Sequence, residues 1–90
     1  MPHLLVRQQF DDFDSWKQVY DSHAELRAAA SCVSSQVLRN DDDPHEVLVL
    51  FEFEDMQKAM GYVASPELRE AWARAGVRGT SEKLRVTPVA

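Results

Sequence analysis

The sequence predicts an α+β domain in which helices cover a four-stranded antiparallel sheet, with the elements in the order β-α-β-β-α-β. Three observations lead to this expectation. Short runs of alternating apolar and polar residues are typical of strands, apolar residues spaced three and four apart mark helices, and the two patterns follow one another in that order. Ninety residues suffice for one domain, so residues 1–90 are expected to form a single one.

The first predicted strand is the run HLLVRQQF at residues 3–10. Side chains alternate between the two faces of a strand, so Leu4, Val6, Gln8 and Phe10 share one face. The other face carries Leu5, Arg7 and Gln9.

An amphipathic helix is predicted from the acidic residues after Asp11 to about Ala30, since carboxylates suit a helix N-terminus. At ~100° per residue, one side of this helix collects aromatic, apolar and titratable side chains. They are Trp16, Val19, Tyr20, His23 and Arg27, with Phe13 and Leu26 at the flanks. His23 therefore stands where a plain core helix would carry a leucine.

The middle of the chain predicts a hairpin. Residues 33–39 are polar enough for an edge strand, and the acidic run 40–44 favours a solvated turn. A calcium loop is disfavoured because regularly spaced ligands and a turn glycine are missing. Residues 46–53, EVLVLFEF, are apolar on both faces. One helical layer covers only one face of a sheet, so a second copy of the chain is expected against the other, as a homodimer.

A second helix is predicted from residues 54–55, interrupted and restarted at Ser65-Pro66-Glu67. Gly76 is placed to end it in the left-handed conformation. A last strand is expected at about residues 82–88. The complete order is the ferredoxin-like one, in which the first and third strands are central.

Composition narrows the function classes. The net charge is −5 and the basic residues are scattered, which argues against nucleic acid or an anionic membrane as partner. The single cysteine, Cys32, is expected to be a buried inert thiol rather than a nucleophile. No metal-ligand spacing and no glycine-rich phosphate loop occur, so no cofactor is expected. Without a signal-peptide pattern or a long apolar run, the chain is expected to be cytoplasmic.

Four stretches carry a family resemblance: residues 14–17 (DSWK) through Tyr20 and His23, residues 37–40 (VLRN) with the acidic turn, residues 46–53 leading into Asp55, and residues 65–70 (SPELRE) through 75–77 (AGV). With these stretches the chain resembles the dimeric α/β-barrel superfamily, and most of all its antibiotic-biosynthesis-monooxygenase-type domains.

The resemblance implies two ferredoxin-like subunits with paired sheets, each holding a cavity between sheet and helices. The superfamily includes cofactor-independent oxygenases of aromatic polyketides, haem-degrading oxygenases, cyclases, isomerases and domains of unknown role. By position, it implies that Trp16, Tyr20 and His23 line the cavity.

His23 is the candidate catalytic residue. A neutral imidazole near its reference pKa of ~6.5 can take a phenolic or enolic proton from a substrate at neutral pH. The resulting anion could react with oxygen or rearrange. The competing interpretation is a core histidine bonded to a backbone carbonyl or to Tyr20.

Candidate substrate-binding residues are Trp16, Tyr20 and Trp72, which could stack on a flat ligand or simply form core. Arg27 could hold a substrate anion, or extend its guanidinium into water. The sequence thus predicts a homodimer that binds a small hydrophobic or aromatic molecule, as a cofactor-independent monooxygenase or cyclase. The alternative is a non-catalytic ligand-binding or scaffold domain, and nucleic-acid binding by the sheet ranks last.

Overall fold

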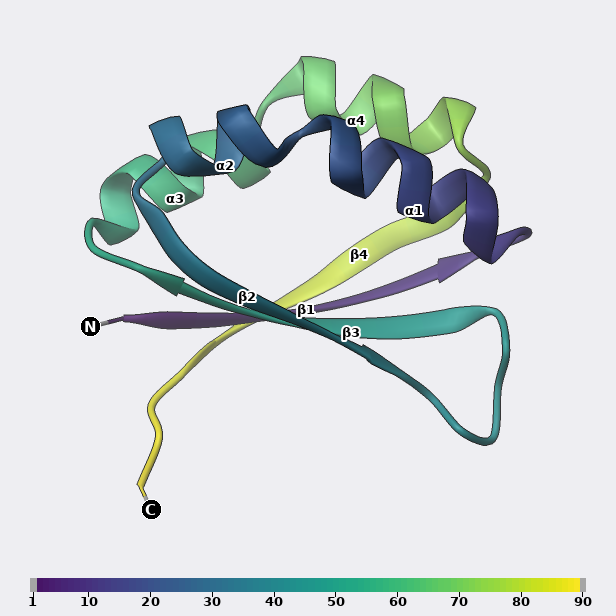
Figure 1. Cartoon of the computed structure of the whole chain (residues 1–90), viewed down its shortest axis with the longest axis horizontal. Coiled ribbons are helices and arrows are strands. Elements are labelled where there is room, and N and C mark those ends of the chain that lie inside the picture. Colours follow the sequence, from purple (N-terminus) through teal and green to yellow (C-terminus); the bar gives the residue numbers. More distant parts are fainter. Residues whose placement is uncertain (1, 90) are drawn as a thin grey trace.

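The computed structural model describes residues 2–89, except for the side chain of Thr80. Four strands form an antiparallel sheet in the spatial order β2-β3-β1-β4, and all four helices lie on one of its faces (Figure 1). The ferredoxin-like order and the central placement of the first and third strands are therefore confirmed. The elements are β1 (His3–Phe10), α1 (Phe13–Ser22), α2 (Ala24–Ala29), β2 (Cys32–Arg39), β3 (Glu46–Phe53), α3 (Met56–Val63), α4 (Pro66–Arg74) and β4 (Val77–Val86).

The core lies between the sheet and the helical layer. The alternation of β1 and β3 sends one set of side chains toward the helices, and these side chains are buried. The face of β1 that carries Leu4 and Phe10 turns toward the helices, since these residues are 1% and 0% exposed. The corresponding face of β3 carries Val47, Val49, Phe51 and Phe53, all buried.

The other face of the sheet is not covered by any helix of this chain (Figure 1). Strand register brings Leu84, Leu5 and Leu50 side by side across β4, β1 and β3. The next row of the sheet pairs Leu38 with Leu48. Leu84 and Leu38 are 56% and 42% exposed. The outer face therefore presents a leucine patch, defined here as Leu5, Leu38, Leu48, Leu50 and Leu84.

Helix α1 starts as predicted, with the Asp12 carboxylate accepting a hydrogen bond from the Ser15 backbone N–H at 3.1 Å. The expectation of one helix reaching Ala30 is wrong, because α1 ends at Ser22. His23 takes φ −100° and ψ 14°, which interrupts the helix before α2 begins at Ala24. The second predicted helix is divided at Ala64 and Ser65, and Pro66 opens α4 as predicted.

Strand β4 differs from the prediction, because it begins at Val77 rather than near residue 82. Gly76 adopts the predicted left-handed conformation at φ +86°, and the chain then enters the sheet at once, with Val77 paired to Phe10. Gly79, at φ +60°, lies where the register against β1 shifts between Arg7 and Gln9. The glycine is thus a bulge within the strand and not a loop before it.

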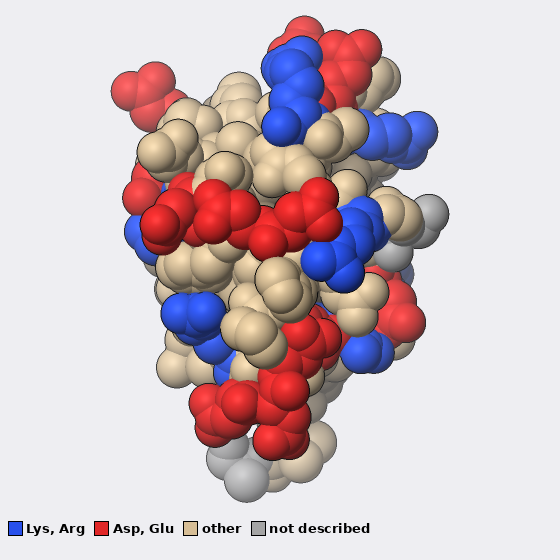
Figure 2. Space-filling view, turned by 90° about the vertical axis from the view of Figure 1, so that its right-hand side faces the viewer, with Lys and Arg blue, Asp and Glu red and all other residues tan. Residues whose placement is uncertain are grey.

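Charge is unevenly spread over the surface. Figure 2 looks at the side on which α1 starts and the β2–β3 turn lies, and acidic side chains form a band and a cluster there. Basic side chains on this side are fewer and separated from one another. This face would repel polyanions. Among residues 2–89, no helix is long and apolar enough to cross a membrane.

Candidate functional site

A cavity of about 360 Å³ lies between the helical layer and the half of the sheet that includes β4. Its volume is within the range of about 300–1,000 Å³ typical of small-molecule sites. Its lining comes from all strands except β2 and from three helices. The lining residues are Val6, Gln8, Trp16, Tyr20, Val49, Phe51, Tyr62, Val63, Leu68, Arg69, Trp72, Ala73, Val77, Gly79, Ser81 and Lys83.

Three of the predicted binding residues come together as a stacked aromatic wall of this cavity. The Trp16 ring stacks on Tyr20 at 5.1 Å and on Trp72 at 5.4 Å between ring centroids, with interplanar angles of 15° and 23°. Trp16 is completely buried, while Trp72 is partly exposed. A wall of aromatic rings offers an apolar surface against which a planar ligand can pack.

A short polar chain fixes the floor of the cavity. The indole Nε1–H of Trp16 donates to Gln8 Oε1 at 2.8 Å, and Gln8 Nε2 donates to Ser81 Oγ at 3.0 Å. Because an indole N–H can only donate, this bond fixes which end of the amide faces the tryptophan. Both polar groups of Gln8 are thereby engaged, which explains how this polar side chain is 7% exposed in the core.

Two basic residues, Arg69 of α4 and Lys83 of β4, also line the cavity, and both are exposed. Neither makes an ion pair with any residue in the described part of the chain. None of the described lining residues is Asp, Glu, His or Cys. Sequence reasoning missed both cations: the alternation of β4 is visible, but which of its faces turns inward depends on pairing with β1.

Arg27 is engaged within the fold instead of facing the cavity. Its Nη1 donates to the Tyr20 carbonyl at 2.6 Å, and its guanidinium carbon lies 3.8 Å from the centre of the Tyr20 ring. The guanidinium thus binds the C-terminal end of α1, where a cation is favoured, and stacks on an aromatic face. Arg27 is 8% exposed and does not extend into water.

His23 lies at the break between α1 and α2, outside the lining of the cavity. Its ring meets the edge of Trp72 at 6.2 Å between centroids and faces two more open surface depressions. His23 is therefore in contact with Trp72, which lines the cavity, but is not itself part of the lining. The prediction that His23 lines the cavity is wrong, because the helix on whose wheel it was placed ends one residue earlier.

The electrostatic setting of His23 keeps its imidazole neutral. Burial, and then the positive charge of Arg27, lower the pKa of His23 below its usual value. Its Nδ1 is buried and makes no hydrogen bond. The bonds to a backbone carbonyl or to Tyr20 that a core histidine would make at this atom are therefore missing.

Other titratable groups near the core do not supply a base. Burial raises the pKa of the Tyr62 hydroxyl in the cavity and that of the Cys32 thiol, so both hold their protons at neutral pH. Among the described residues, no group of three or more His, Cys, Asp or Glu could hold a metal ion. The cavity is thus equipped for binding through rings and cations.

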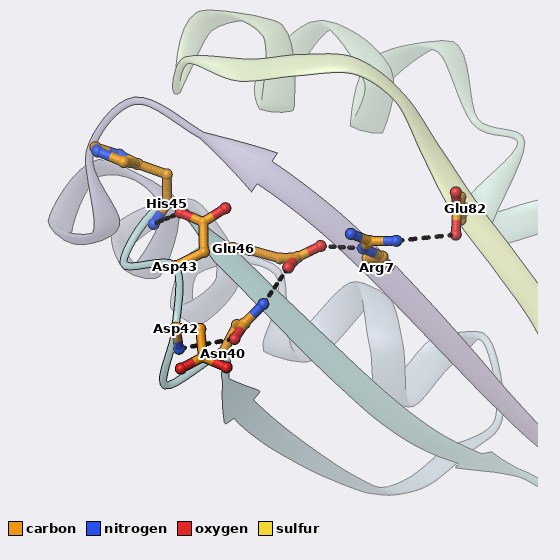
Figure 3. A network of polar contacts seen from close by, with 7 residues as sticks. All are labelled: Arg7, Asn40, Asp42, Asp43, His45, Glu46 and Glu82. Atoms are coloured by element: carbon orange, nitrogen blue, oxygen red, sulfur yellow. Dashed lines mark hydrogen bonds and ion pairs between the residues drawn. The ribbon is translucent and has the colours of Figure 1, made fainter.

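A polar network, distinct from this cavity, crosses one end of the outer sheet face (Figure 3). The Glu46 carboxylate accepts hydrogen bonds from Arg7 Nε and, at 2.6 Å, from Asn40 Nδ2. Arg7 also reaches Glu82 at 3.8 Å. The bonds from Arg7 and then from Asn40 lower the pKa of Glu46. Glu46 is 2% exposed, so the network ties β1, β3 and β4 together through a buried carboxylate.

Comparisons with known proteins agree with this architecture. No curated protein sequence matches the chain. Among solved structures, SnoaB, a cofactor-independent oxygenase from Streptomyces nogalater, superposes with a TM-score of 0.76 at 18% identity, over 99% of this chain and 93% of that one. Rv0793 from Mycobacterium tuberculosis gives 0.66 at 12% identity, over 100% and 97% of the two chains. At such identities these likenesses establish the fold.

A crystal structure described as an antibiotic biosynthesis monooxygenase gives a TM-score of 0.71 at 13% identity and covers 100% of both chains. The family model described as antibiotic biosynthesis monooxygenase matches residues 8–74, which include the whole of β3 and the whole aromatic wall. The chain therefore belongs to the antibiotic biosynthesis monooxygenase family, within the dimeric α/β-barrel superfamily.

Proposed function

We propose that this protein is a homodimer that binds a small flat aromatic molecule in the cavity between its sheet and helices. The observation that carries the proposal is the stacked wall of Trp16, Tyr20 and Trp72 along a cavity of about 360 Å³. A ring laid against this wall would gain apolar burial and stacking, each with a defined orientation.

The proposal can be tested through the tryptophans, because both tryptophans of the chain line the cavity. A hydroxyanthraquinone bound there should quench their fluorescence in a saturable way. A panel of hydroxyanthracenes, quinols and small lactones should separately raise the melting temperature where a member binds, since ligand binding stabilises the native state by mass action.

A matched pair of variants on α4 locates the binding. Ala73 lines the cavity, whereas Ala71 faces the open depressions beside His23. Ala73→Phe should abolish quenching by filling the cavity, and Ala71→Phe should retain it. Quenching that survives Ala73→Phe, or no binding by any member of the panel, would overturn the proposed site.

Homodimer formation is the second part of the proposal, and it is supported by the leucine patch on the outer sheet face. The patch spans all four strands, and the helices leave it uncovered. A contiguous exposed apolar surface of this kind is typical of an interaction site. A second sheet packed on it would cover the patch on both copies, as in the superfamily to which the chain belongs.

Catalysis is a second candidate, in the form of cofactor-independent oxygenation or cyclisation of the bound molecule with His23 as general base. Two observations favour it: the likeness to SnoaB, a cofactor-independent oxygenase, and the neutral His23 ring whose Nδ1 has no partner. His23 contacts Trp72 but does not line the cavity, so the base would act only after a movement that brings its ring to the bound molecule. Without that movement the protein is a binding domain.

A further inference from the structure

We infer that the cavity selects a flat aromatic molecule carrying one anionic oxygen group, with the rings against the stacked wall and the anion at the mouth between Arg69 and Lys83. This inference rests on the proposed function and names the chemical class of its ligand. It replaces Arg27, which the sequence suggested as the anion-binding residue, with two residues from other elements.

The first argument is the state of the polar groups in the cavity. The polar groups on the floor of the cavity already have hydrogen-bond partners, since Gln8 is bonded to both Trp16 and Ser81. The Tyr20 hydroxyl is likewise bonded to Ser35. Arg69 and Lys83 make no ion pair within the described chain. They are therefore the charged groups of the lining that remain available to a ligand.

The second argument is charge. The protein carries a net charge of −5, yet the described lining contains two cations and no carboxylate. The cations line the same cavity from opposite layers, Arg69 from helix α4 and Lys83 from strand β4. An anion at this point would meet positive charge on both sides, next to apolar walls that strengthen the attraction.

The third argument is orientation. Both cations are exposed, while Trp16 in the middle of the ring stack is completely buried. A charge placed deep among the rings would be desolvated without a partner, which is unfavourable. The anionic group must therefore stay at the mouth, and the ring system must point inward.

The experiment compares two probes of nearly equal shape, 2-naphthoate and 2-naphthamide, by isothermal titration calorimetry at pH 7. The full-length protein is used, together with the double variant Arg69→Gln/Lys83→Gln. Its control is Arg74→Gln/Arg85→Gln, which removes the same charge from the same helix and strand at residues outside the cavity lining. Melting temperatures check that both variants are folded.

Wild type should bind naphthoate about tenfold more tightly than naphthamide, since ionic hydrogen bonds are about twice as strong as neutral ones. The preference should shrink as salt is added and disappear in Arg69→Gln/Lys83→Gln, but persist in the control. Equal binding of the two probes overturns this inference and leaves the proposed function standing. A preference retained without Arg69 and Lys83 also overturns it. Binding of neither probe refutes the proposed function together with this inference.

Discussion

Trp16 is the side chain that joins the core to the cavity. Its ring packs against Phe10, Phe13, Tyr20 and Trp72, with centroids between 5.1 and 6.0 Å apart. Its only polar atom is satisfied by Gln8. A tryptophan held on every side loses no further conformational freedom when a ligand stacks beside it, so the wall is preorganised for binding.

At His23 the structure predicts a pH dependence of stability. Folding lowers the pKa of this imidazole, so the unfolded chain binds more protons in the interval between the folded pKa and the unfolded value of about 6.5. The stability contributed by neutral His23 is complete above about pH 6.5 and is lost as the pH falls through that interval. In His23→Gln the decline over this interval should be smaller.

Urea unfolding at closely spaced pH values between 5 and 8 measures this effect. His45→Gln is the control, because His45 is exposed and close to the β2–β3 turn. If the free energy of unfolding depends on pH in the same way in wild type and in His23→Gln, the His23 imidazole has the same pKa in the folded and unfolded chain, which would contradict the prediction. The same variant tests catalysis, since a turnover that depends on His23 as base would be lost in His23→Gln while ligand binding remains.

At the scale of the element, the sequence predicted the strands more accurately than the helices. The alternation of β1 and β3 specifies which side chains share a face, because a strand has only two faces. The wheel drawn over residues 11–27 placed Trp16 and Tyr20 in the cavity lining correctly but did not do so for His23. No proline or glycine marks the break between α1 and α2 in the sequence. Arg27 of α2 stabilises the break by its hydrogen bond to the Tyr20 carbonyl of α1.

The two cations of the cavity lining could not be predicted from the sequence, for a related reason. Lys83 and Leu84 alternate in β4, and pairing with Val6 and Leu5 of β1 turns the lysine toward the helices and the leucine away. An exposed leucine and an inward-facing lysine reverse the usual pattern of an edge strand. Both fit the two proposals made above, a ligand on one side of the sheet and a second copy of the chain on the other.

Arg27 is predicted to stabilise the junction of α1 and α2. Arg27→Met keeps most of the apolar stem but removes the hydrogen bond to the Tyr20 carbonyl and the stacking on its ring. Hydrogen bonds to charged groups contribute about 1.5–3 kcal/mol, and the variant should be destabilised by an amount in that range. Urea unfolding at pH 7 measures it, with Arg74→Met on exposed α4 as control.

The affinity of Arg27→Met for an anionic aromatic probe separates the two roles considered for this residue. The structural role leaves that affinity unchanged under conditions where the variant is folded. A loss of affinity equal to that of Arg69→Gln/Lys83→Gln would return Arg27 to the ligand site.

At the scale of the whole molecule, the two faces of the sheet differ in what they carry. The inner face carries the core and the cavity, while the outer face carries the leucine patch with the Arg7–Glu46–Asn40 network at one end (Figure 3). The hydrogen bonds from Arg7 and Asn40 lower the pKa of Glu46 in the folded protein. The ionised carboxylate therefore adds stability, which is complete above the unfolded pKa of about 4.5 and is lost as the pH falls through the folded pKa. Because the Glu46 carboxylate is buried and hydrogen-bonded within its own chain, it fixes the register of the strands but does not attract a second copy of the chain.

The last prediction concerns assembly, and two exposed leucines make it a controlled one. Leu84 is 56% exposed within the leucine patch, and Leu26 is 50% exposed on α2, on the helical side of the molecule. Leu84→Glu places a charge in the proposed dimer interface on both copies, whereas Leu26→Glu places the same charge outside it. Burying unpaired carboxylates costs at least about 3 kcal/mol, which raises the dimer dissociation constant by about two orders of magnitude. Analytical ultracentrifugation over a concentration series should give a dimer for wild type and Leu26→Glu, and a monomer for Leu84→Glu at micromolar concentrations. A monomeric wild type, or a Leu84→Glu dimer as tight as wild type, would show that the patch is not the interface.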